Sequence, residues 1–268
     1  MFQLLPSLIA LGAAMAAMTV LWALSTRLRD VSIIDPFWPA AFVVLGGAYG
    51  LALDAPFGAR GTLMLILLGL WTLRLGGYLL WRWFQHEEED HRYAAMRESR
   101  GDGFVVSSLW VVFWLQAGLA WVVAAPVFAS LGRGPELGVL AWIGAGVWAV
   151  GMCFEAGADW QLARFKADPS NKGQVLDSGL WALTRHPNYF GNFTIWWGLY
   201  LIAVDAGGLA WVSLYGPAFM SFLLLKVSGV AMLEKDIGER RPAYADYIRR
   251  TNAFFPGPKK ALPERAEA

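Results

Sequence analysis

Residues 159–197 read DWQLARFKADPSNKGQVLDSGLWALTRHPNYFGNFTIWW and form the longest polar interval in a mostly apolar chain. Hydrophobic segments lie on both sides of it, so the interval predicts a polar connection between membrane spans. Pro187 suits the first turn of a helix, where its missing N–H would be unpaired anyway. Arg185 and His186 then form a basic helix entrance, a kind of site that attracts anions.

Two interpretations of this interval are open. One is an ordinary connecting loop with common turn residues. The other is a binding site, because charges, amides and an aromatic ring gather beside glycines that permit close backbone approach. We favour the binding site, and its candidate residues are Asp159, Arg164, Lys166, Asn171, Lys172, Gly173, Arg185, His186, Asn188, Tyr189 and Asn192.

The composition of the chain is that of a polytopic membrane protein. Of its 268 residues, 57% are hydrophobic and only 16% are charged, whereas soluble domains carry about 25% charged residues. The net charge of +1 argues against a nucleic-acid partner. Cys153 is the only cysteine, which excludes an intramolecular disulfide and suggests a buried apolar filler or, less simply, a catalytic thiol.

The apolar segments predict an all-α integral membrane protein with seven transmembrane helices. The first segment lacks a basic flank and is too long for a signal peptide, so we expect a retained span. The expected spans are Leu4–Leu24, Phe37–Leu53, Thr62–Phe84, Phe104–Leu131, Gly138–Glu155, Tyr189–Val204 and Gly208–Leu233.

The distribution of Lys and Arg predicts the orientation of these spans. One set of connections carries 18 of these residues, and the opposite set carries only Arg60 and Arg133. The positive-inside rule therefore places the N-terminus outside and the C-terminus in the cytosol. The interval 159–197 then lies on the cytosolic side, within a single domain over residues 1–257. Residues 258–268 have the composition of a disordered tail.

Several charged residues within or beside the spans are candidates for function, because ionisable groups in a membrane are costly. Trp71, Arg74, Tyr78 and Arg82 share one helical face. Arg74 either points into the bundle or snorkels to the interface. Glu155 and Asp159 share another face with Lys166, which is either a simple charge ladder or a contact surface for a cofactor.

Asp35 precedes Pro36 at the start of the second span. It is either a helix N-cap or a general acid that donates a hydrogen bond to a substrate carbonyl. Asp236 and Arg240 follow the last span, where they either close over a cofactor or interact with anionic lipid. The sequence has no GxGxxG, P-loop or GxSxG motif, and its three histidines lack cysteine partners, so we expect no metal site.

Five segments resemble membrane steroid 5-alpha-reductase-like proteins, specifically their bacterial branch, often called DUF1295. These segments are GLWALTRHPNYFGNFTIWWG (179–198), DPFW (35–38), WTLRLGGYLLWR (71–82), EDHRYAAMR (89–97) and YADYIRRTNAFFP (244–256). The resemblance covers most of the chain. Its RHPxYxG core is less specific, since membrane methyltransferases and other sterol reductases carry a similar string.

The resemblance implies an NADPH-dependent reductase that acts on the carbon–carbon double bond of a hydrophobic enone, such as a 3-oxo-4-ene steroid. It implies a monomer in the bacterial inner membrane, surrounded by lipid. The alternatives are a membrane methyltransferase that uses S-adenosylmethionine on a lipidic substrate, and a lipid-binding scaffold without enzymatic activity.

The resemblance also implies residue roles. Glu155 and Asp159 would contact the nicotinamide and ribose, and the other polar residues of the interval, with Arg74, Arg92, Tyr93, Asp236 and Arg240, would complete the NADPH site. Asp35 falls near the family's substrate-side acid. The family's catalytic tyrosine falls on Trp71, with Tyr78 as the nearest phenol. Trp71 and Asn192 depart from the family pattern, which expects tyrosine and glutamate there.

Overall fold

A computed structural model describes residues 3–53, 57–86, 88–132, 136–227 and 243–260. Within these ranges all regular structure is helical, which confirms the expected fold class. Six helical stretches are long and apolar enough to cross a membrane, so the chain is a multi-pass membrane protein by helix length and hydropathy. They are Leu4–Leu28, Val31–Ala52, Ala59–Phe84, His91–Val123, Val139–Ala167 and Gly208–Val227.

The expectation of seven spans is met only in part. The expected span Tyr189–Val204 falls within α9 (Pro187–Val204), a helix that is not among the six candidates. Its polar residues, among them Asn188 and Asn192, reduce its hydropathy. The fourth stretch begins earlier than expected, because residues of the charged connection form α4 (His91–Arg100). The orientation in the membrane stays a prediction.

The contacts within the chain divide it into two compact units. Unit 1 comprises Met1–Ala145 and Leu199–Gly216, and unit 2 comprises Gly146–Gly198 and Pro217–Ala268. Three of the described helices therefore contribute residues to both units, namely α8 (Val139–Ala167), α9 and α10 (Tyr215–Phe222).

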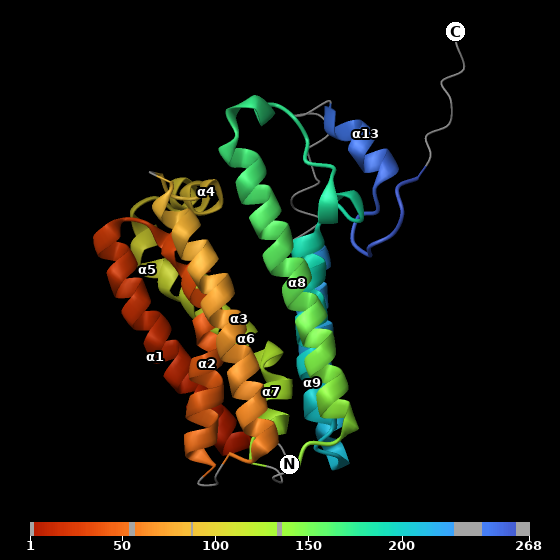
Figure 1. Ribbon diagram of the computed structural model, residues 1–268. Coiled ribbons are helices and arrows are strands. Elements are labelled where there is room, and N and C mark those ends of the chain that lie inside the picture. Colours follow the sequence, from red (N-terminus) through yellow and green to blue (C-terminus); the bar gives the residue numbers. More distant parts are fainter. Residues whose placement is uncertain (1–2, 54–56, 87, 133–135, 228–242, 261–268) are drawn as a thin grey trace. The chain divides into compact units, whose positions relative to one another are not determined.

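Unit 1 is built on three long helices that run side by side: α1 (Leu4–Leu28), α2 (Ile34–Ala52) and α3 (Ala59–Phe84), shown in red to orange in Figure 1. The short 3-10 turn η1 (Val31–Ile33) joins the first two. Buried residues of α1 recur every three or four positions, from Ala10 through Met18 to Ser25. This spacing gives α1 one inward stripe, which packs against α2.

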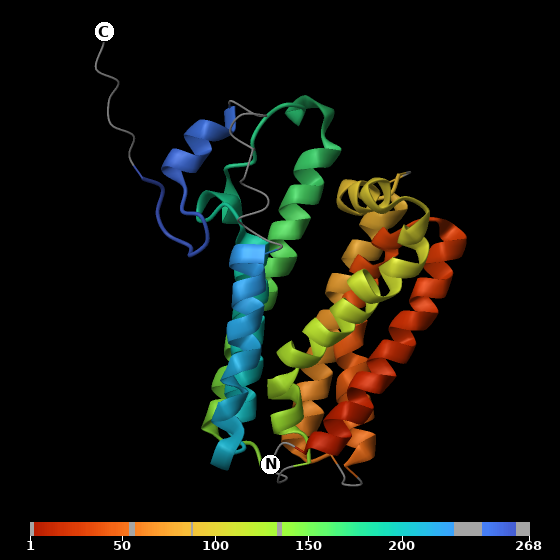
Figure 2. The ribbon, with the colours of Figure 1, turned by 180° about the vertical axis from the view of Figure 1, so that it is seen from behind.

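The fourth stretch of unit 1 is an interrupted helix. It consists of α4, the 3-10 turn η2 (Gly101–Gly103), α5 (Phe104–Ser108), the π-helical segment η3 (Leu109–Trp114) and α6 (Leu115–Val123), which α7 (Ala125–Ser130) follows. Figure 2 shows η3 and α6 lying along α1. Trp114 of η3 donates from Nε1 to the Thr19 hydroxyl of α1 at 2.9 Å. Trp22 of α1 donates from Nε1 to the Val105 carbonyl of α5 at 2.9 Å, and this carbonyl also accepts from the Ser108 hydroxyl at 2.8 Å.

A buried ion pair closes the opposite end of unit 1. Arg60, at the start of α3, donates from Nε and Nη2 to Asp205 Oδ2 at 3.2 and 3.0 Å. The backbone N–H of Gly138 donates to the same oxygen at 2.9 Å, and Arg60 also binds the Glu136 carbonyl. The pair therefore fixes three chain segments, including the connection after α9 that leads into η6 (Gly208–Leu214).

Unit 2 depends on a close crossing of α8 and α9. A Cβ atom on Gly191 would lie 2.4 Å from the backbone nitrogen of Glu155, and one on Gly151 would lie 2.7 Å from the Gly191 carbonyl. Real Cβ atoms do not approach backbone this closely, so the crossing requires glycine. The other elements of unit 2 are η4 (Pro169–Asn171), η5 (Gly179–Ala182), η7 (Leu223–Val227) with most of α10 (Tyr215–Phe222), and α13 (Ala243–Arg250).

Candidate functional site

Two carboxylate–amide pairs form across the α8–α9 crossing of unit 2. Asn188 donates from Nδ2 to Asp159 Oδ1 at 3.0 Å, and Asn192 donates to Glu155 Oε1 at 3.4 Å. The two carboxylates are one turn apart on α8, and the two amides are one turn apart on α9. Glu155, Asp159 and Asn192 are buried. The structure thus brings together four of the residues that the sequence singled out.

The amide of Asn192 offers a free acceptor in this cluster. Its Oδ1 is buried and makes no hydrogen bond within the described part of the chain. A buried acceptor without a partner is costly, so a ligand N–H or O–H at this atom would be favourable. Carboxylates can accept hydrogen bonds from the hydroxyls of a ribose, and amides can pair with the carboxamide of a nicotinamide. The side chains of this cluster are therefore of the kind that fits the nicotinamide–ribose half of NADPH.

The loop before α9, residues 179–186, is called the signature loop here. It is bound to the C-terminal segment, residues 243–260. Arg185 Nη1 donates to the carbonyls of Ile248 and Thr251 at 3.0 and 2.6 Å, and its backbone N–H donates to the Asn252 carbonyl. The Tyr247 hydroxyl donates to the Trp181 carbonyl at 2.6 Å. The Arg185 guanidinium therefore binds the carbonyl end of α13. The sequence had predicted an anion as its partner and had not predicted this contact.

The remaining polar residues of the interval have varied surroundings. His186 is buried, and its ring lies 5.8 Å from that of Tyr189. The guanidinium of Arg164 lies over Trp160 at 5.5 Å. Asn171 Nδ2 donates to the Phe165 carbonyl at 3.0 Å, a contact that closes the end of α8. Lys166, Lys172 and Gly173 are exposed, and Gly173 has a φ of +84°.

A second polar cluster lies in unit 1, where α4 meets the start of α2. Arg92 Nη2 donates to Asp35 Oδ2 at 2.7 Å, and the Tyr93 hydroxyl donates to Asp35 Oδ1 at 2.7 Å. Both oxygens of this carboxylate are thus bound. The N-cap interpretation of Asp35 is wrong, because Ile33 occupies the cap position of α2 and Asp35 lies in the first turn.

Asp90, which the sequence reasoning missed, positions this cluster. Its Oδ1 accepts from the backbone N–H of Arg92 at 3.0 Å and so caps α4. The same oxygen accepts from Arg92 Nε at 2.8 Å, which orients the guanidinium toward Asp35. An aspartate two residues before an arginine, at the start of a helix, was the available signal.

The shared face of α3 continues outward from the core of unit 1. Trp71 is fully buried and its ring meets that of Phe42 edge-on at 5.6 Å. Tyr78 lies between two cations, with Arg74 at 5.6 Å and Arg82 at 5.9 Å from its ring centre. The expectation that these residues share a face is confirmed. Asp236 and Arg240 lie outside the described residues.

A family model described as "Protein of unknown function (DUF1295)" matches residues 21–251. The chain belongs to the DUF1295 family. An uncharacterized protein of Schizosaccharomyces pombe is 26% identical to this DUF1295 chain over 271 residues, covering 88% of the chain and 76% of the relative.

A second relative carries a functional name. "Probable O-methyltransferase ustE" of Ustilaginoidea virens is 30% identical over 140 residues, which is 52% of this chain and 44% of that protein. No solved structure matches the chain.

Proposed function

We propose that this chain is a membrane-embedded enzyme that uses NADPH to reduce the activated carbon–carbon double bond of a hydrophobic enone, with a 3-oxo-4-ene steroid as the model substrate. The observation that carries the proposal is the Tyr93 hydroxyl held 2.7 Å from the Asp35 carboxylate. A carboxyl and a phenol acting on the substrate carbonyl are what the reductase family uses. The family resemblance placed the catalytic phenol at Trp71 or Tyr78, whereas in the structure the phenol beside Asp35 is that of Tyr93.

Tyr93 and Asp35 would stabilise the charge that develops on the substrate oxygen. When bound, NADPH would supply a hydride to the β-carbon of the enone, and a proton from solvent at the α-carbon would complete the reduction. The Tyr93 phenol would turn its O–H from Asp35 to the carbonyl oxygen and donate a hydrogen bond that strengthens as enolate charge builds there. Arg92 keeps the carboxylate in place while the proton moves, because it binds the other carboxylate oxygen.

The carboxylate–amide cluster of unit 2 supports the cofactor assignment. Glu155, Asp159, Asn188 and Asn192 would hold the nicotinamide and ribose half through hydroxyl and amide hydrogen bonds. The exposed residues Lys166, Lys172 and Arg164 carry positive charge of the kind that binds phosphates, including the 2′-phosphate that distinguishes NADPH from NADH. Equal affinity for the two nucleotides would contradict this part of the proposal.

The test compares single-atom changes in purified protein. Tyr93→Phe should lower the turnover of NADPH with a 3-oxo-4-ene steroid by about 10²–10⁴-fold, as expected for loss of an acid catalyst. Its affinity for NADPH should stay the same. Tyr215→Phe is the matched control, because it removes an exposed phenol from the same unit. Full activity of Tyr93→Phe would overturn the assignment.

A methyltransferase that uses S-adenosylmethionine is the second candidate, and the name of the Ustilaginoidea virens relative favours it. The RHPxYxG string at Arg185–Gly191 is compatible with both activities. Mass spectrometry of the small molecules that co-purify with the protein separates the two. Bound S-adenosylmethionine or its demethylated product, with no nicotinamide nucleotide, would replace the reductase by the methyltransferase.

A further inference from the structure

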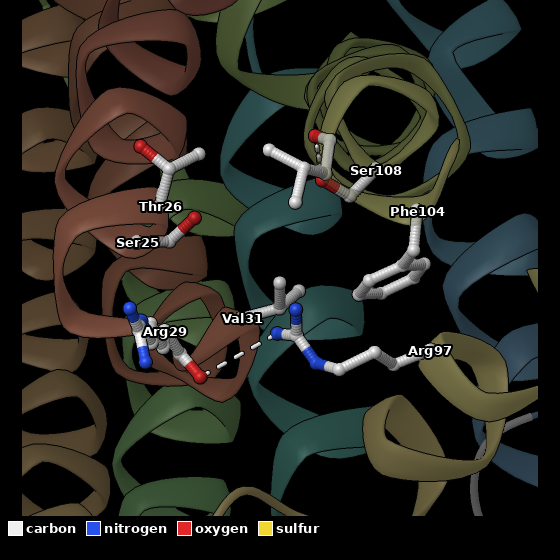
Figure 3. A pocket seen from close by; sticks show the side chains of 8 residues that line it. Ser25, Thr26, Arg29, Val31, Arg97, Phe104 and Ser108 are labelled. Atoms are coloured by element: carbon white, nitrogen blue, oxygen red, sulfur yellow. Dashed lines mark hydrogen bonds between the residues drawn. The ribbon is translucent and has the colours of Figure 1, made fainter. Parts of the chain in front are cut away.

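A cavity of about 310 Å³ opens in unit 1 where α1 ends and α5 begins (Figure 3). Its lining includes Ser25 and Arg29 of the α1 end, Arg97 of α4, and Val105 and Ser108 of α5. None of these residues belongs to either cluster described above. The volume is at the low end of small-molecule pockets, which suits a headgroup rather than a whole lipid.

Arg97 is held in a fixed position at the floor of the cavity. Its Nε and Nη2 atoms bind both oxygens of Glu89 at 2.9 and 2.8 Å, and its guanidinium lies 4.8 Å from the ring centre of Phe104. Figure 3 shows it reaching toward the Arg29 carbonyl, a contact of 3.5 Å. Within the described residues no hydrogen bond uses its Nη1 atom. A preoriented donor edge therefore remains for a ligand.

The polar groups of the lining suit an anionic group with a hydroxyl. Glu89 pairs with Arg97 and Asp30 also acts on it electrostatically, so the open Nη1 donor of Arg97, and not an excess of positive charge, favours an anion here. The hydroxyl of Ser25 donates to the Trp22 carbonyl at 2.8 Å, so its oxygen is left as an acceptor. A ligand that brings one negative charge and a hydroxyl donor would match both features.

The surroundings of the cavity are those of a membrane boundary. Leu24 and Leu28 are exposed on the last turns of α1, and Val105 and Trp110 are exposed on the helix opposite. The charged connection begins directly after α1. A ligand whose polar end lies on Arg97 would thus have its apolar end beside side chains that face hydrocarbon.

We propose that this cavity binds the headgroup of an anionic phospholipid, with the phosphodiester on Arg97 and Arg29 and a headgroup hydroxyl on Ser25. Phosphatidylglycerol has this chemistry. Its acyl chains would lie outside the cavity, along the exposed apolar residues of α1 and α5. The site is independent of the proposed reductase activity.

A pair of neighbouring valines provides the test. Val105→Trp fills the cavity with a ring at an exposed lining position, whereas Val106→Trp adds the same ring at an exposed position outside the lining. Native mass spectrometry in detergent with added phosphatidylglycerol should show one bound lipid on the wild-type protein. Val105→Trp should lower its occupancy by about fivefold or more, which corresponds to about 1 kcal/mol. Val106→Trp should leave it unchanged.

A second pair separates the site from general attraction of lipid to basic residues. Arg29→Gln removes a lining charge, and Arg27→Gln removes an exposed charge from the same helix end outside the lining. Only Arg29→Gln should weaken phosphatidylglycerol binding. Equal binding of phosphatidylcholine, equal competition by inorganic phosphate, or equal effects within either pair of variants would overturn the proposal.

Discussion

The Arg60–Asp205 and Arg92–Asp35 pairs of unit 1 have similar geometry and different surroundings. In the Arg60–Asp205 pair, the side chains are 8% and 6% exposed, and Asp205 also accepts a backbone N–H from Gly138. In the Arg92–Asp35 pair, they are 34% and 32% exposed, and the additional partner of Asp35 is the Tyr93 hydroxyl. Asp205 is thus enclosed by protein groups, whereas Asp35 is partly accessible to solvent.

This difference predicts a structural role for the Arg60–Asp205 pair and is compatible with the proposed role of Asp35. A buried ion pair is expensive to break, because removing one partner leaves the other charge without compensation. A pair that is one third exposed contributes little to stability, since water can replace either partner. It can therefore exchange partners during a reaction. We expect Asp205 to act on folding and Asp35 to act on chemistry.

The largest expected effect is on the stability of Asp205→Asn. This change leaves the Arg60 guanidinium buried without its counter-charge and should lower the free energy of unfolding by about 3–5 kcal/mol. Thermal unfolding in detergent, followed by loss of monodisperse protein, measures it. A change in the midpoint no larger than that of Asp35→Asn would remove the distinction between the pairs.

Acidification should reproduce part of this loss in the wild-type protein. Burial alone would raise the pKa of Asp205, but the N–H groups of Gly138 and Arg60 outweigh it and hold that pKa below its ordinary value of 3.8. A lowered pKa means that the unfolded chain binds the proton more readily, so stability is present above pH 3.8 and falls below it.

The effect at pH 3 should be no larger than that of the substitution, because protonation of Asp205 removes the same negative charge. Unfolding midpoints of wild type and Asp205→Asn at pH 6 and pH 3 measure it. The wild type should lose more stability on acidification than the variant does. Identical pH dependence in the two proteins would contradict the role of this carboxylate.

The smallest expected effect on stability is that of Asp35→Asn. We expect a change of no more than about 1 kcal/mol, the range of exposed ion pairs. Turnover should nevertheless fall, because an amide cannot take part in proton transfer with Tyr93. Comparing the unfolding midpoint and the rate of NADPH consumption in one preparation measures both. A variant that is fully active and equally stable would return Asp35 to a passive role.

The sequence predicted the helical membrane architecture because hydrophobic length is a local property. Segments such as Leu4–Leu28 and Ala59–Phe84 are long and mostly apolar, so their existence does not depend on tertiary contacts. Helical spacing likewise placed Arg74 and Tyr78 on one face. The expected span Tyr189–Val204 lies within the helix α9, whose polar residues lower its hydropathy.

The partners of the site residues were much harder to predict, because they come from distant parts of the chain. The contact of Asp35 with Tyr93 joins residues 58 positions apart, and that of Arg185 with Thr251 joins residues 66 positions apart. No local pattern encodes such pairings. The capping role of Asp90 is local, but the expected spans left residues 85–103 as a connection, so the helix α4 was not predicted.

The binding of the signature loop to the C-terminal segment has a consequence for genetics and for protein engineering. Gly257 donates its N–H to the Leu183 carbonyl, and Thr184 donates to the carbonyls of Ala253 and Phe254. Residues far outside the RHPNYFG string thus complete its surroundings. A stop codon that deletes only the residues after position 250 should behave like a lesion in the site itself, and an affinity tag is best attached beyond Lys260.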